Sequence, residues 1–233
     1  MWEMSRLGFA QLQADGWDLT VATVNRQVRD NRGTAVRMLV RKGKDASTAV
    51  SLRIPGVEVA PIGESFVRGS TLCFSQVESP DHPVGLELSF TVIAGGSDLL
   101  VIESVISIKT SLWDAWPRLE LGVGSITREN ELGKDYPLAP MEGGSCHWWS
   151  ANPQQGSSGT VLTHLACDER DSQSLDRVSA VRPGSVGFFG DFLERGVIRR
   201  IRPWWVWSER PLDSLTVANL GRQIEEKPLP LTN

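Results

Sequence analysis

The order of apolar and polar positions along the chain is that of a protein built from β-strands. Residues 86–92 alternate apolar and polar side chains, as expected for a strand with one face in solvent. A turn-forming segment follows at residues 94–98. Residues 99–110 are then apolar on both faces, which indicates a strand covered on both sides. Together these segments predict a β-hairpin at the centre of the protein.

Further segments of strand character are separated by short turns such as Pro55-Gly56. They cover residues 20–28, 34–40, 50–54, 57–59, 70–75, 119–123, 161–166 and 197–207. Spacing this short leaves no room for helices between strands, which argues against a parallel α/β sheet. The sequence therefore predicts an all-β fold, an antiparallel two-sheet sandwich that forms one domain over residues 1–233.

Two segments depart from this pattern. Residues 213–226 have the clearest helical periodicity, with Asp213 as the N-cap, and we expect less than about 15% helix in the whole chain. Residues 125–159 are rich in Gly, Pro, Ser and Asn, which predicts a long surface loop. Loops of this length often carry function. Either Trp148 and Trp149 are buried and fix this loop, or they face a ligand.

Composition and charge narrow the class of protein. A hydrophobic fraction of 40% with 22% charged residues is typical of a globular chain, and a net charge of −4 gives no reason to expect nucleic acid as a partner. No apolar run reaches the roughly 18 residues that span a membrane. Three cysteines without CxxC spacing, after a start that lacks a signal peptide, predict free thiols in the cytoplasm and no metal site.

Tryptophan is the unusual residue, with nine copies against one tyrosine. An indole offers a flat apolar face and one N–H donor, which suits stacking on a sugar ring. In a strand, Trp205 and Trp207 share one face and Trp204 takes the other. The candidate ligand-binding residues are Trp148, Trp149, Trp205, Trp207, Arg200 and Arg202. The alternative is that these tryptophans are buried between the sheets.

Few residues are candidates for acid–base chemistry. Glu103 interrupts an apolar strand face, and a buried carboxylate needs a partner, so we expect it to be buried and paired with an arginine. Glu194, His147 and His164 are the candidate catalytic residues. The motifs of nucleotide-binding proteins, zinc proteases and serine hydrolases are absent, so no cofactor is expected.

Several segments resemble the galactose-mutarotase-like β-supersandwich superfamily. They are residues 68–76, the hairpin 86–110, residues 111–119 and residues 192–200. In that superfamily a concave sheet face holds sugars, and the epimerases use a glutamate base with histidine acids. The resemblance implies recognition of a carbohydrate or carbohydrate-like ligand on a concave sheet face. One alternative is a sugar epimerase or mutarotase with Glu194 as base and His147 or His164 as acid. Another is a non-catalytic protein-interaction or scaffolding domain.

Overall fold

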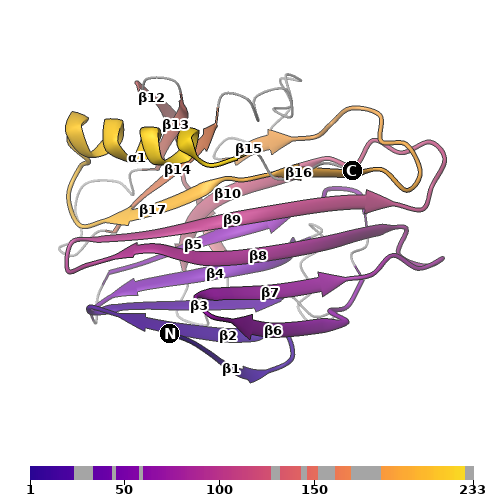
Figure 1. The fold of residues 1–233 in the computed structure, drawn as a ribbon, viewed down its shortest axis with the longest axis horizontal. Coiled ribbons are helices and arrows are strands. Elements are labelled where there is room, and N and C mark those ends of the chain that lie inside the picture. The colour runs from indigo at the N-terminus through magenta and orange to yellow at the C-terminus, as the bar shows by residue number, and fades with distance from the viewer. Residues whose placement is uncertain are drawn as a thin grey trace.

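Two antiparallel β-sheets pack against each other in the computed structural model, which describes residues 1–23, 34–43, 46–57, 60–126, 132–142, 146–151, 161–168 and 185–228 (Figure 1). The first sheet runs in the order β1 (Trp2–Arg6), β2 (Phe9–Ala14), β3 (Trp17–Thr23), β4 (Thr34–Lys42), β5 (Ala46–Arg53) and β10 (Leu119–Ile126). The free edge of β10 then pairs with β15 (Ser185–Phe188) and, further along, with β11 (Leu132–Asp135).

The second sheet contains the predicted hairpin at its centre. Its order is β12 (Leu138–Met141), β13 (Cys146–Ala151), β14 (Leu162–Asp168), β17 (Trp204–Ser208), β9 (Leu99–Thr110), β8 (Val84–Gly95), β7 (Thr71–Gln76) and β6 (Glu64–Arg68). β16 (Ile198–Ile201) continues along the edge of β9 beyond β17. The all-β, antiparallel two-sheet sandwich predicted from the strand pattern is confirmed.

The main core lies between the two sheets. Leu100, Ile102 and Ile106 of β9 and the stacked rings of Trp205 and Trp207 are buried there. On the opposite face of the second sheet, the helix α1 (Ser214–Glu226) covers β13, β14, β17 and the start of β9. The first part of β9, around Val101, is therefore covered on both sides, as its doubly apolar sequence predicts, whereas the outward-facing Val105 further along is only partly buried.

Helix α1 forms where the periodicity predicts it. Asp213 caps its N-terminus, and the backbone N–H of Thr216 donates to the Asp213 carboxylate at 2.6 Å. Val217, Leu220 and Ile224 form its buried stripe, which packs on β13, β14 and β17. The helical residues of the described chain are these 13, within the predicted limit.

Other element predictions need correction. The strand predicted over residues 197–207 is two strands, β16 and β17, because Pro203 has no N–H for the ladder with β9. The described part of residues 125–159 contains β11, β12 and β13 instead of only a loop. Val57 lies outside any strand and residues 58–59 fall outside the described residues, as do residues 24–28 of another predicted strand. β1, β2, β6 and β15 were not predicted.

Candidate functional site

Three of the four tryptophans predicted to bind a ligand are buried. Trp205 and Trp207 lie in the core between the sheets, with 1% and 0% of their surface exposed. Trp148 is 1% exposed and packs beneath α1 with Trp204. Strand alternation correctly assigned Trp205 and Trp207 to one face and Trp204 to the other, but both faces are covered. At 1% exposure or less, Trp148, Trp205 and Trp207 present almost no ring surface to a ligand.

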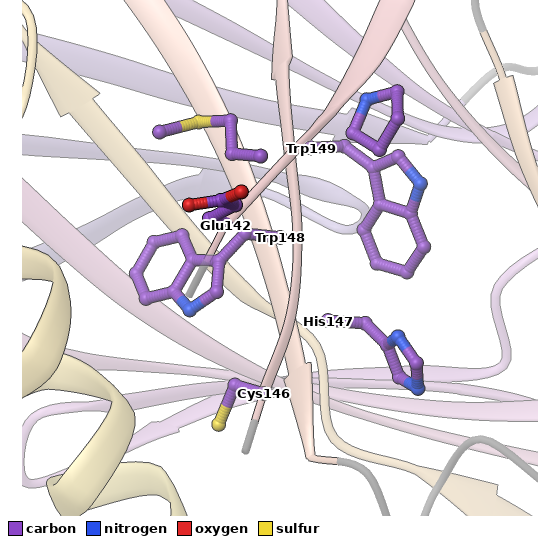
Figure 2. A pocket seen from close by; sticks show the side chains of 7 residues that line it. Glu142, Cys146, His147, Trp148 and Trp149 are labelled. Carbon is purple, nitrogen blue, oxygen red and sulfur yellow. The ribbon is translucent and has the colours of Figure 1, made fainter. Parts of the chain in front are cut away.

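Trp149 is the half-buried exception. Its ring stacks with that of His147, with 6.0 Å between centroids and 30° between planes. Both residues line an open pocket of about 430 Å³ at the β12–β13 pair, together with Glu142 and Trp148. Figure 2 shows Trp149 and His147 on one side of β13 and Trp148 on the other side, toward α1. The indoles therefore do not converge on one ligand position.

The two predicted arginines make internal contacts. Arg200 donates from Nε to the Ser107 hydroxyl at 3.0 Å. The buried Arg202 donates from its guanidinium to the carbonyl of Ile224 at 3.0 Å and to that of Lys227 at 3.3 Å. Arg202 therefore satisfies carbonyls at the C-terminus of α1, which lack partners within the helix.

Glu103 is buried beside this arginine, as predicted. Its Oε1 lies 3.6 Å from Arg202 Nε, and its other oxygen accepts a hydrogen bond from Lys227. Arg202 also lies 3.9 Å from the buried carboxylate of Asp168. The Lys227 ammonium lies 4.9 Å from the Trp204 ring centroid. This buried ion cluster fixes the end of α1 on the second sheet.

The three candidate catalytic residues are not brought together. His164 is buried, its Nε2 lies 3.3 Å from the Ser208 hydroxyl, and burial lowers its pKa to about 4. His164 lies opposite Val206 of β17, and Val206 in turn lies opposite Val101 near the start of β9. Glu194 lies in the exposed turn beside Thr110, at the end of β9. At roughly 3.3 Å per residue, these two ends of β9 are about 30 Å apart. His147 lies one strand beyond His164.

The most exposed aromatic residues are two tryptophans outside the predicted site. Trp113 is 74% exposed and Trp116 is 61% exposed. They lie in the loop after β9, next to the loop that leads into β16, at the right-hand end of Figure 1. A bridge between Ala115 and Leu193 joins the loops, and the Leu193 N–H donates to the Ala115 carbonyl at 2.8 Å. Both bridge residues are buried.

This bridge determines what the loops present to solvent. Residues that flank a bridged position point away from it. Accordingly, Asp114 and Trp116 on one loop, and Phe192 and Glu194 on the other, are all exposed. Trp116 and Phe192 are in ring contact, with centroids 5.7 Å apart and planes tilted by 59°.

A further pair lies at the next position along the two loops. The Arg195 guanidinium carbon lies 5.0 Å from the centroid of the Trp113 ring. The exposed Arg199 guanidinium donates to the Phe192 carbonyl at 2.8 Å. We call the combined feature the tryptophan surface; it consists of Trp113, Asp114, Trp116, Phe192, Glu194 and Arg195. It offers exposed ring faces beside carboxylate acceptors and a guanidinium donor.

The tryptophan surface was missed because the strand pattern ends before it begins. Residues 111–118 contain two tryptophans separated by Asp114 and Ala115 and followed by Pro117, which belongs to a turn and not to a strand. Tryptophans in such a segment have no strand face to fill. The turn-like composition of residues 111–118 therefore favours Trp113 and Trp116, and not the tryptophans of the strands, as the exposed ones.

Comparisons of the chain with models of protein families, with curated proteins and with solved structures found no match. The resemblance to the galactose-mutarotase-like superfamily therefore stays a prediction. Within the described ranges, no three His, Cys, Asp or Glu side chains form a group that could hold a metal ion. Among the described residues, α1 is neither long nor apolar enough to cross a membrane.

Proposed function

We propose that this protein recognises a carbohydrate by stacking sugar rings on the tryptophan surface. The observation that carries the proposal is the exposure of two indoles, 74% and 61%, on loops held together by the Ala115–Leu193 bridge. Grouped exposed apolar rings on a soluble surface usually mark a binding site. Because the bridge fixes the loops beforehand, little ordering is needed when a ligand binds.

The chemistry of the surface suits a sugar. The C–H face of a pyranose is apolar and can cover an indole, while its hydroxyl groups need donors and acceptors at the ring edge. Asp114 and Glu194 supply acceptors, and Arg195 supplies donors. This site lies on loops at one end of the sandwich and not on a concave sheet face. Among the predicted ligand-binding tryptophans, Trp149 keeps a partly open ring, and its strand β13 is separated from β9 by β14 and β17.

The same surface could bind a protein, since Leu112 beside it is also exposed. A glycan-array screen followed by intrinsic-fluorescence titration tests the proposal. We expect Trp113→Ala and Trp116→Ala each to weaken glycan binding by about tenfold or more, since each removes a stacking ring. Phe66→Ala, at an exposed aromatic residue on the edge strand β6, is the control and should leave binding unchanged.

Circular dichroism of each variant checks that the fold is retained. Absence of any glycan ligand on the array would contradict the proposal. So would glycan binding that both tryptophan variants leave intact. In either case the protein-interaction alternative becomes the better explanation of the exposed rings.

A further inference from the structure

We propose that helix α1 is a detachable cover, which leaves the second sheet as a unit while the two sheets stay folded. Opening exposes the rings of Trp148 and Trp204, which lie beneath α1 in the closed state. The cover lies at the left of Figure 1, away from the loops that carry the tryptophan surface at the right. Its opening therefore does not depend on carbohydrate binding.

The sandwich keeps its main core when α1 leaves. Among the described residues, the core between the sheets is built from strands and their loops and includes no residue of α1. The helix follows β17, the last strand of the described chain, and packs on the outer face of the second sheet. Its departure therefore removes no strand pairing and leaves the inner faces of both sheets buried.

Side chains attach α1 to the sheet at a few points. Its buried stripe packs on the outer cluster, and the Arg202 guanidinium donates to the carbonyls of Ile224 and Lys227. The Cys146 thiol donates to the Gly221 carbonyl at 3.6 Å. A central strand is held instead by backbone hydrogen bonds to neighbours along both edges. Elements with fewer buried contacts open at a lower free energy than the core strands.

The closed state contains two polar groups that opening would hydrate. Trp148 and Trp204 are at most 1% exposed, and within the described part of the chain neither indole N–H has an acceptor. A buried donor without an acceptor destabilises the state that buries it. The helix also contains Thr216, Val217 and Gly221, which have low helix propensity. Both features lower the free energy of opening α1 and leave the core between the sheets unaffected.

Two native thiols distinguish opening of α1 from unfolding of the sandwich. Cys146 is 5% exposed and lies beneath α1, whereas Cys167 on the neighbouring strand β14 is 0% exposed and faces the core between the sheets. Opening of α1 exposes Cys146 alone, and global unfolding exposes both. The test measures the rate at which each thiol of the native protein reacts with a thiol reagent, with peptide mass spectrometry to assign the label. We expect Cys146 to react at least about tenfold faster than Cys167.

Three variants show which element opens. Asp213→Ala removes the N-cap of α1 and should raise the Cys146 rate about fivefold. Ile106→Val loosens the core between the sheets, so it should raise the Cys167 rate by a similar factor and leave the Cys146 rate unchanged. Gln223→Ala, at an exposed position on α1, is the control and should accelerate neither thiol. Circular dichroism checks that each variant is folded.

Equal rates for Cys146 and Cys167 would overturn the proposal, because α1 would then open only when the whole protein unfolds. The same conclusion would follow if Ile106→Val accelerated both thiols equally. A fast Cys146 rate that Asp213→Ala leaves unchanged would also overturn it, because the reagent would then enter at the end of β13 without movement of α1. Amide hydrogen exchange is the independent check, and the amides of α1 should be protected at least about tenfold less than those of β9.

Discussion

Replacing Glu103 with alanine removes the carboxylate that joins the central strand β9 to the end of α1. In the folded protein this carboxylate contacts Arg202 and Lys227, and only 8% of the residue is exposed. After the substitution the buried Arg202 guanidinium keeps, of the described carboxylates, only that of Asp168 nearby to balance its charge. The substitution also removes the acceptor that holds Lys227 above the Trp204 ring.

The magnitude follows from what Arg202 retains. Breaking a buried ion pair by removing one partner costs about 3–5 kcal/mol. Arg202 keeps the Asp168 carboxylate at 3.9 Å and its hydrogen bonds to the last turn of α1, so its charge stays partly compensated. We therefore expect a loss near the lower limit, about 3 kcal/mol. For a chain of this size that corresponds to a decrease in Tm of roughly 6–12 °C.

Chemical denaturation followed by circular dichroism measures the effect as a change in midpoint at constant slope. Glu103→Gln keeps the shape and one acceptor oxygen and should recover part of the loss. Glu87→Ala removes an exposed carboxylate from the adjacent strand β8 and should change stability by no more than about 0.5 kcal/mol. An unchanged midpoint for Glu103→Ala would refute the reasoning, because it would mean that the ion cluster contributes nothing to folding.

Two further predictions concern pH and thiols. Because burial lowers the pKa of His164 to about 4 from 6.5, the unfolded chain binds a proton there at higher pH than the folded protein does. Stability should therefore fall as pH decreases from about 6.5 to 4, by up to about 3 kcal/mol, and His164→Leu should lack this component in denaturation curves measured across that range. Cys73, Cys146 and Cys167 form no disulfide, so thiol titration of the denatured, unreduced protein should give three thiols; a value of one would contradict this.

The sequence predicted the sheets better than the site because different physics determines them. Alternation and doubly apolar runs report burial directly, which is why the β8–β9 hairpin, the helix α1 and the buried pairing of Glu103 were all predicted correctly. Edge strands such as β1 and β6 were missed because they bury few side chains and have mixed patterns. Burial alone did not make a strand predictable, since the short strand β15 was also missed although three of its four residues are buried.

The site predictions depended on which indoles face solvent, and periodicity alone does not determine that. Trp205 and Trp207 occupy a strand whose two faces are covered by the first sheet and by α1. The first sheet is built mainly from residues far away in the sequence, and the periodicity of the strand itself does not show which element packs on each of its faces. The pairing of the loop at Trp116 with the loop at Phe192 likewise joins segments far apart in the chain. The tryptophan surface forms through contacts between these two loops, which the sequence did not predict. The sequence indicated only that residues 111–118 form a turn.

The position of β9 has a consequence for synthesis on the ribosome. One edge of β9 pairs with β8, which precedes it directly, but the other edge pairs with β16 and β17, which begin at Ile198. While the chain is being made, β9 therefore presents a long apolar strand with an open hydrogen-bonding edge until those later residues emerge. Such an edge can pair with another nascent chain. Folding yield should thus depend on how quickly the C-terminal part of the chain follows β9 out of the exit tunnel, and on any chaperone that covers this edge in the meantime.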